Sequence, residues 1–262
     1  CSSDLTGRSF TNVYGYVGVS VVKDELMMEG MNEKGLSAGL FYFPDYGKYE
    51  EYSETNKETN ISDFQLVSYI LGRCATVDEV KAEIANVHVH GFDPRSSTVH
   101  WRFAEPSGRQ VVLEIIDGKC IFYENTLGVL TNSPSFDWQL TNLNNYVNLL
   151  PGRTEPHTLG NMSLSSFGGG SAMIGLPGDF TPPSRFVRAA FFQNTAPQKP
   201  NAEGSVFTAF HILGSMEIPI GAQFAPGQEP ADIPSATQCT CVTDMSGLRF
   251  YYRSMYDGGI RC

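Results

Sequence analysis

The first residue of the chain carries two groups that together could perform catalysis. Cys1 has a thiol side chain and, at the start of the sequence, an α-amino group on the same carbon skeleton. A thiol is a good nucleophile only as the thiolate, and an α-amino group with a pKa near about 7.7–8.0 can take its proton at neutral pH. We therefore expect Cys1 to supply both the nucleophile and the base.

Two other interpretations of Cys1 stay open at this point. A cysteine–histidine pair of the papain type needs a histidine within hydrogen-bond reach, and the sequence offers His88, His90, His100, His157 and His211. His211 falls in an apolar helical stretch, which is typical of a core residue. The opening Cys-Ser-Ser also fits a lipid-modified cysteine, which would make the chain a non-catalytic, lipid-anchored binding protein.

The remaining cysteines predict neither a disulfide framework nor a metal site. Their spacing is irregular, so we expect them to be reduced, mostly buried and inert; they are Cys74, Cys120, Cys239, Cys241 and Cys262. The Cys-x-Cys pair at 239 and 241 has no second pair or histidine cluster beside it, as a zinc site requires. No metal and no cofactor are expected.

Composition excludes several classes of protein. With 262 residues, 41% of them hydrophobic, the chain can bury a core, and one domain is expected over residues 1–262. The net charge of -10 argues against a nucleic-acid partner. No apolar run reaches the roughly 18 residues of a membrane-spanning helix.

Hydrophobic spacing predicts helices in four regions. Residues 60–88 show two consecutive helical patterns, and Thr76 with Glu79 predicts a capping box at the start of the second. Residues 136–150 also have helical spacing, and two more helices are expected over 184–193 and 205–216.

Short β-rich runs separated by turns predict antiparallel strands at residues 99–103, 111–116, 120–123, 127–130, 239–242 and 248–255. Residues 152–183 are predicted to form a long loop that shapes a binding site. Because helices group with helices and strands with strands, the pattern predicts an α+β fold with helices packed on mostly antiparallel sheets.

Several segments form a recognisable set, in one order along nearly the whole chain, and the most specific is Gly128-Val129-Leu130-Thr131-Asn132-Ser133-Pro134. The others are Cys1-Ser2-Ser3, Gly7-Arg8-Ser9, residues 30–36, 39–41, 136–138 and 142–144, the run 175–186, and 210–213. Together they resemble the choloylglycine hydrolase family, which includes bile salt hydrolases and penicillin V acylases. The resemblance implies an αββα four-layer sandwich of two antiparallel sheets between helical layers, the N-terminal-nucleophile hydrolase fold, assembled as a homotetramer.

The resemblance also implies roles for site residues. Arg8 would lie beside the thiol and favour the thiolate, since a guanidinium lowers a neighbouring pKa. Asn132 matches the oxyanion-hole asparagine, Phe41 the position that adds a backbone N–H, and Arg185 a second active-site arginine. A pocket for the acyl group would be lined by apolar and aromatic residues, namely Phe41, Tyr42, Met173 and Ile174.

The chain departs from the family pattern near its start. Arg8 lies only seven positions after Cys1, and the family's aspartate is absent from residues 9–11, Ser-Phe-Thr. We expect disordered loops to be left out near residues 3–12 and the C-terminal end to be missing.

Both branches of the family cleave an amide that joins a bulky acyl group to a small amine. The substrate expected here is a conjugated bile salt, with glycine or taurine as the amine and an acyl-thioester on Cys1 as the intermediate. Penicillin V is the alternative substrate, because Phe41 matches neither the asparagine of many bile salt hydrolases nor the tyrosine of some penicillin acylases.

Overall fold

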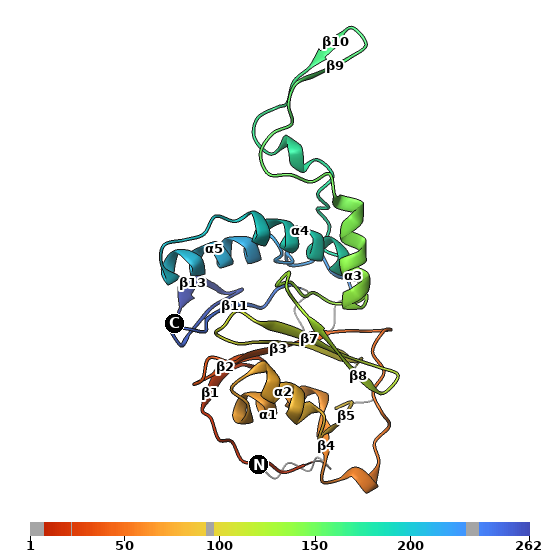
Figure 1. Ribbon diagram of the computed structural model, residues 1–262, viewed down its shortest axis with the longest axis vertical. Helices are drawn as coiled ribbons and strands as arrows, with labels where there is room; N and C mark the ends of the chain where they lie inside the picture. The colour runs from red at the N-terminus through yellow and green to blue at the C-terminus, as the bar shows by residue number, and fades with distance from the viewer. Residues whose placement is uncertain (1–7, 22, 93–96, 229–235) are drawn as a thin grey trace.

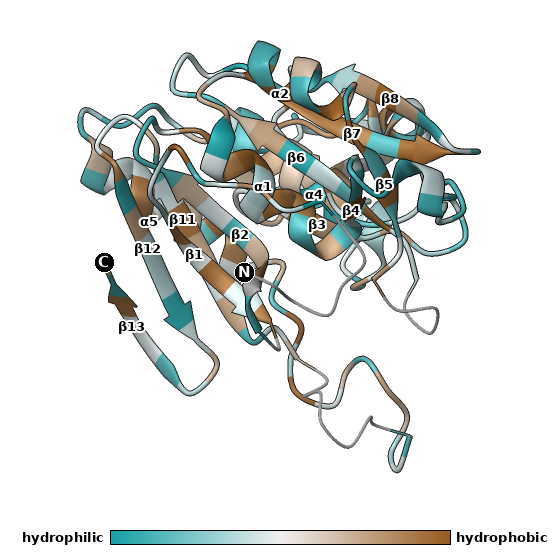
Figure 2. Cartoon of the chain, turned by 90° about the horizontal axis from the view of Figure 1, so that it is seen from below, coloured by the Kyte–Doolittle hydropathy of each residue, from teal (hydrophilic) through white to brown (hydrophobic). Residues whose placement is uncertain are grey.

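An antiparallel sheet forms the centre of the protein. The computed structural model describes residues 8–21, 23–92, 97–228 and 236–262, and within them this main sheet has six strands in the order β1-β2-β3-β6-β7-β8. The strands are β1 (Tyr16–Val21), β2 (Lys23–Asn32), β3 (Ser37–Tyr42), β6 (Val99–Ala104), β7 (Gln110–Ile116) and β8 (Lys119–Glu124). Strand β7 is hydrophobic along most of its length (Figure 2), and Glu114 interrupts its apolar run.

Two helices cover one face of the main sheet. Helix α1 (Leu66–Arg73) has seven buried residues and helix α2 (Val77–Ile84) has three. They pack on every second residue of the strands, for example Trp101 and Phe103 of β6 and Leu113 of β7, all fully buried. This alternation places the intervening residues of β6 and β7 on the opposite face.

The opposite face meets a second sheet and a second helical layer. Strands β11 (Cys239–Asp244), β12 (Arg249–Ser254) and β13 (Asp257–Arg261) form this sheet, which has three strands within the described residues. Helices α4 (Pro182–Thr195) and α5 (Ala202–Gly214) lie outside it. The order of layers is therefore α4/α5, second sheet, main sheet, α1/α2 (Figure 1), which is the αββα sandwich.

The second sheet does not extend across the whole main sheet. Where it ends, helix α4 and helix α3 (Phe136–Asn142) pack directly on β7 and on the segment after β8. This smaller core consists of Val112, Val129, Phe136, Phe186 and Ala190. The packing brings residues 129–136 and the start of α4 together at one end of the sandwich.

A close approach between the two sheets explains one glycine. Gly35, in the turn between β2 and β3, has φ of 82°, which favours glycine. A Cβ atom there would lie only 2.5 Å from the carbonyl oxygen of Met245, in the turn between β11 and β12. Gly35 therefore lets the turns of the two sheets touch.

Smaller elements complete the fold. Strands β4 (Asn60–Ser62) and β5 (His88–His90) form a short parallel pair. Residues 150–181 project from the sandwich (Figure 1) and end in a hairpin of β9 (His157–Leu159) and β10 (Met162–Leu164). Within the described residues, 3-10 helices span Glu54–Asn56, Asp63–Gln65, Leu143–Tyr146 and Ser171–Met173.

Most of the predicted elements are confirmed, and two predictions are corrected. Residues 127–130 form no strand, because Gly128 has φ of 75° and its N–H donates to the side chain of Asn125, which closes a turn. The helix predicted over 136–150 ends at residue 142 and continues as a 3-10 turn. At α2, the N–H of Glu79 donates to the Thr76 hydroxyl as predicted, while the Glu79 carboxylate accepts from Ala75.

Asp63 should make stability depend on pH. The side chain of Asp63 is fully buried, and burial raises the pKa of its carboxyl to about 6, above the value of about 3.9 in an unfolded chain. Between about pH 4 and pH 6 the folded protein therefore binds more protons than the unfolded chain, so the free energy of unfolding falls as pH rises. Asp63→Asn should remove this part of the fall.

Urea unfolding at pH 4, 5, 6 and 7 measures the effect. Asparagine keeps an oxygen to accept from the N–H groups of Phe64 and Phe92, which both donate to Asp63 Oδ1. A variant whose stability declines over this range as steeply as that of the unmodified protein would show that Asp63 does not titrate as described.

Candidate active site

Asn132 and Arg185, which are 53 positions apart in the sequence, form a hydrogen bond. Arg185 Nη2 donates to Asn132 Oδ1 over 2.6 Å, and Asn132 Nδ2 donates to the carbonyl oxygen of Tyr42 over 2.8 Å. Because a guanidinium only donates, the amide oxygen must face Arg185, which fixes the orientation of the Asn132 amide. The pair lies at the end of strand β3, beside the start of helix α4.

The residues before helix α4 hold Arg185 in place. Pro182 begins the helix, where its missing N–H costs nothing, and Arg185 Nε donates to the Phe180 carbonyl over 3.0 Å. The Asp179 carboxylate accepts from the hydroxyls of Ser184 and Thr181. These hydrogen bonds, that of Ser184 first, hold the pKa of Asp179 down to about 2.

Arg185 is partly buried, and its guanidinium keeps a positive charge that can interact with a nearby anion. Burial first, and the neighbouring Arg188 second, lower the pKa of the Arg185 guanidinium from its usual value. A guanidinium remains protonated in proteins despite such shifts. A cation that is partly removed from water interacts more strongly with a nearby negative charge.

Asn132 has one N–H available for a ligand. Its NH₂ group has two donors, of which one is used by Tyr42, and the other has no partner within the part of the chain that the structure describes. An amide N–H of this kind can stabilise a negative oxygen that develops on a substrate carbonyl. The pair therefore offers a donor next to a positive charge, as acyl transfer requires.

Phe41, the third predicted member of this group, lines a large cavity. The cavity has a volume of about 520 Å³ and lies between strands of both sheets and helices α4 and α5; besides Phe41 its walls include Leu130, Ala189, Ile212, Leu213 and Val242. An ion pair of Glu29 and Arg102, 3.3 Å apart, lies in the same wall. Polar and apolar side chains both line this cavity, and neither Asn132 nor Arg185 is among its lining residues.

The other predicted pocket residues lie elsewhere. The side chain of Tyr42 is 55% exposed, although its carbonyl holds Asn132. Ile174 is 78% exposed, and with Met173 it belongs to the projecting segment of Figure 1. None of these three residues lines the cavity of Phe41, so their role in binding an acyl group stays a prediction.

Arg8 lies away from Asn132 and Arg185. Its N–H donates to the Asn60 carbonyl over 2.8 Å, and its guanidinium stacks over the ring of Tyr69 in α1, 5.7 Å from the centroid. Arg8 is therefore on the α1/α2 side of the main sheet, whereas Asn132 and Arg185 are on the α3/α4 side. Cys1 lies outside the described residues, so its predicted place beside Arg8 stays untested.

The structure corrects the prediction for His211 and bears on the alternative of a cysteine–histidine pair. His211 is exposed on α5 and is not a core residue. His100 is fully buried, with Nδ1 3.1 Å from Glu114 Oε1 and Nε2 2.9 Å from the Thr131 carbonyl oxygen. Both ring nitrogens are therefore occupied, which argues against His100 as the base of a cysteine–histidine pair.

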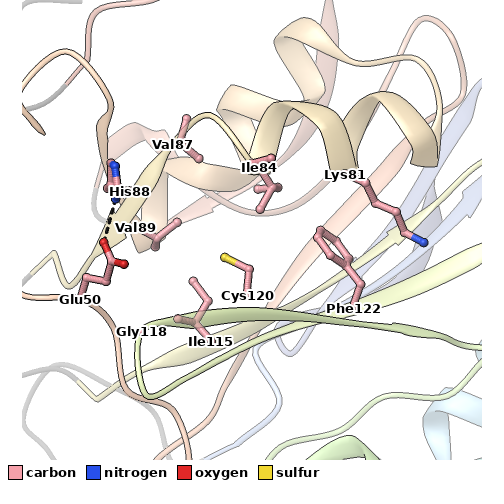
Figure 3. Close-up of a pocket in the computed structure, with 11 residues that line it drawn as sticks. Glu50, Lys81, Ile84, Val87, His88, Val89, Ile115, Gly118, Cys120 and Phe122 are labelled. Carbon is pink, nitrogen blue, oxygen red and sulfur yellow. Dashed lines mark hydrogen bonds and ion pairs between the residues drawn. The ribbon is translucent and has the colours of Figure 1, made fainter.

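A second cavity contains none of the predicted site residues. It measures about 370 Å³ and lies between α2 and strands β7 and β8 (Figure 3). Ile84, Ile115 and Phe122 surround the thiol of Cys120, and the Glu50–His88 ion pair, 2.7 Å across, closes one end. This cavity lies on the α1/α2 side of the sheet, away from Asn132.

The described cysteines are all free thiols, as expected, but only Cys74 is buried; Cys120 and Cys262 are exposed. The sulfur atoms of Cys239 and Cys241 are 3.6 Å apart.

Among the described residues, no three histidine, cysteine or acidic side chains gather where they could hold a metal ion. In the same residues, every helix is too short or too polar to cross a membrane.

Comparison with known proteins shows the family to which the chain belongs. The model of the choloylglycine hydrolase family, described as linear amide C–N hydrolases, matches residues 1–261. The bile salt hydrolase/transferase of Clostridium perfringens is 32% identical over 96% of this chain and 77% of its own length. The penicillin V acylase of Pectobacterium atrosepticum is 29% identical over 94% of this chain and 64% of its own length.

Solved structures agree with the sequence comparison. The crystal structure of a variant of the conjugated bile acid hydrolase from Clostridium perfringens aligns with a TM-score of 0.80, at 32% identity, over 96% of this chain and 77% of that one. The penicillin V acylase of Agrobacterium tumefaciens aligns with a TM-score of 0.73 over 96% and 69%, and at 24% identity it shows the fold alone. The chain therefore belongs to the choloylglycine hydrolase family and is a linear amide C–N hydrolase.

Proposed function

We propose that the protein hydrolyses the amide bond of bile salts conjugated to glycine or taurine, with Cys1 as the nucleophile. The observation that carries this proposal is the Asn132–Arg185 pair, which offers a free amide N–H beside a guanidinium. Relatives named bile salt hydrolase/transferase, among them two that are 32% and 34% identical to this chain, support the choice of substrate.

The reaction would proceed in two stages. Cys1 Sγ attacks the substrate carbonyl carbon while its proton passes to the α-amino group of the same residue, and the oxygen becomes an anion facing Asn132 Nδ2. The C–N bond then breaks, and the amine leaves with the proton from the α-ammonium group. Water, activated by the same amine, attacks the resulting thioester and releases the bile acid and the free thiol.

The position of Arg8 is compatible with this mechanism. Seven residue steps separate Cys1 from Arg8, and a fully extended chain of that length reaches about 25 Å at most. The contact of Arg8 with Tyr69 therefore does not fix the thiol on the α1/α2 side. In this proposal Arg185 supplies the positive charge beside Asn132.

Penicillin V is the second candidate substrate. The relative from Pectobacterium is named a penicillin V acylase, and the aromatic acyl group of penicillin V, phenoxyacetate, could pack against the apolar part of the cavity wall beside Phe41. Parallel assays with glycocholate, taurocholate and penicillin V separate the two. Release of glycine or taurine should exceed release of the penicillin nucleus, and the reverse ranking would assign the chain to the acylase branch.

A protein of another class would give a different result. If Cys1 carried a lipid or an acyl group on its amine, that amine could not act as a base, and the chain would be a non-catalytic, lipid-anchored binding protein. The intact mass of the N-terminal peptide decides this. The proposal expects an unmodified cysteine, and a mass increase equal to a diacylglyceryl or acyl group would contradict it.

A further inference from the structure

A buried pair of side chains lies directly behind Asn132. His100 of β6 and Glu114 of β7 are both 0% exposed, and they face the α3/α4 side of the main sheet. The imidazole stacks on the ring of Phe43, with centroids 4.3 Å apart and planes 9° from parallel. The stack and the surrounding strands fix the plane of the imidazole, so each of its two nitrogens faces one fixed partner.

The hydrogen bonds of the pair determine where its protons lie. Nε2 of His100 faces the Thr131 carbonyl oxygen at 2.9 Å, and because a carbonyl only accepts, Nε2 must carry a hydrogen. Nδ1 faces Glu114 Oε1 at 3.1 Å, and one proton lies between these two atoms. Glu114 thereby sets the protonation of the ring so that the bond to Thr131 can form.

Glu114 also holds a second point of the same segment. Its Oε1 accepts from the backbone N–H of Phe136, the first residue of α3, over 2.8 Å. The hydroxyl of Thr131 donates to the Pro182 carbonyl at the start of α4 over 3.1 Å. The pair therefore fixes both ends of residues 131–136, and one of these ends is also tied to the helix that carries Arg185.

The link from Thr131 to Asn132 is covalent and rigid. The Thr131 carbonyl and the Asn132 N–H belong to one planar peptide unit, so holding the carbonyl oxygen sets the orientation of that plane. The Asn132 side chain, which begins one bond further along, is aimed at Tyr42 and Arg185 from this fixed base. A shift of about 1 Å in such a donor can cost about 10² in rate.

We propose that His100 and Glu114 are positioning residues, which hold the Thr131–Asn132 peptide so that the Asn132 amide is aimed at the developing oxyanion. The proposal rests on the proposed role of Asn132 in hydrolysis. It assigns to the pair no contact with substrate, because both side chains are enclosed by β6, β7, Phe43 and α3. Their effect passes through the orientation of one peptide unit.

Glu114→Gln is the variant that tests the proposal, because it changes one oxygen to an NH₂ group at nearly equal volume. If the amide oxygen faces His100, a neutral ring must protonate Nδ1 and present a bare Nε2 to the Thr131 carbonyl. If the NH₂ group faces His100, the Phe136 N–H loses its acceptor. In either case one of the two hydrogen bonds that fix residues 131–136 is lost. We therefore expect kcat to fall about tenfold or more at nearly unchanged KM.

Asn32→Asp is the matched control. Asn32 is 2% exposed on the α1/α2 side, and its Nδ2 donates to the Leu71 and Cys74 carbonyls over 2.8 and 2.7 Å. This control replaces an NH₂ group with a carboxylate oxygen, whereas Glu114→Gln replaces a carboxylate oxygen with an NH₂ group. It also breaks buried hydrogen bonds, but it does not change any contact of residues 131–136. It should lower the thermal midpoint while leaving kcat of the folded fraction unchanged.

Two further measurements separate positioning from general stability. The double variant Glu114→Gln with Asn132→Ala should be no slower than Asn132→Ala alone, because a residue that acts through Asn132 has nothing left to position. Amide hydrogen exchange over residues 131–136 should speed up in Glu114→Gln and not in Asn32→Asp. Additive losses in the double variant, an equal loss of kcat in the control, or unchanged exchange would each overturn the proposal.

These outcomes also distinguish this proposal from the proposed function. If the unmodified protein hydrolyses none of the conjugated bile salts or penicillin V, the proposed function fails, while the exchange measurement still decides whether Glu114 holds the segment. If the unmodified protein is active and Glu114→Gln retains its kcat, the positioning role fails and the proposed function stands.

Discussion

Cys1→Ser should nearly abolish hydrolysis of glycocholate while leaving the fold intact. A hydroxyl is a far weaker nucleophile than a thiol near neutral pH, and the α-amino base that suits a thiol cannot ionise it to a comparable extent. Initial rates at saturating substrate, with circular dichroism to confirm folding, measure the effect.

Cys120→Ser is the control for this substitution. Cys120 is a free cysteine in the wall of the cavity on the α1/α2 side of the main sheet, and partial burial of its sulfur raises the pKa of the thiol, which keeps it protonated. Its replacement should leave turnover unchanged. Full activity of Cys1→Ser, or loss of activity in Cys120→Ser alone, would place the nucleophile elsewhere.

Asn132→Ala should have the second largest effect. It removes the amide N–H that we propose stabilises the developing oxyanion, and it leaves the Arg185 guanidinium without the oxygen to which it now donates over 2.6 Å. Loss of one oxyanion donor typically raises the barrier by about 2.7–4 kcal/mol, which is about 10² to 10³ in kcat. The ratio of kcat to KM for glycocholate should fall by a similar factor, because the donor acts mainly in the transition state.

Asn144→Ala is the control for Asn132→Ala. Asn144 is an exposed residue of the 3-10 turn after α3, and its side chain donates only to the Thr141 carbonyl. Asn144→Ala should keep full activity. If Asn132→Ala were as active as Asn144→Ala, the oxyanion role assigned to Asn132 would be wrong.

The helices could be predicted from sequence because their signals are local. Thr76 and Glu79 stand at the start of α2, and the hydroxyl of Thr76 caps it as the spacing indicates. The predicted strand at residues 127–130 failed because Gly128 takes a left-handed conformation that periodicity does not reveal. Strands β1 to β3 gave no clear prediction, since β2 and β3 are buried over long stretches and show little alternation.

The site could be predicted only in part, because its members are far apart in sequence. The approach of Asn132 to Arg185 depends on where α4 packs, and only the resemblance to the family pointed to both residues. The position of Arg8 against Tyr69 depends on the path of residues 8–12 beneath α1. No local pattern encodes that path.

The His100–Glu114 pair was missed although the sequence carried a signal for it. Glu114 interrupts the apolar run of β7, and a carboxylate within such a run must find a partner if it is buried. His100 is the residue after Val99 at the start of a β-rich run. The two could have been paired only by knowing that β6 and β7 are adjacent and in which register.

Mass spectrometry of the quenched reaction shows whether Cys1 carries the acyl group during turnover. The protein is mixed with glycocholate, quenched with acid during steady turnover and digested, and the mass of the N-terminal peptide is measured. We expect a cholyl group on Cys1 that disappears once the substrate is consumed. Continued release of glycine with no cholyl group on that peptide, or with the group on another residue, would contradict it.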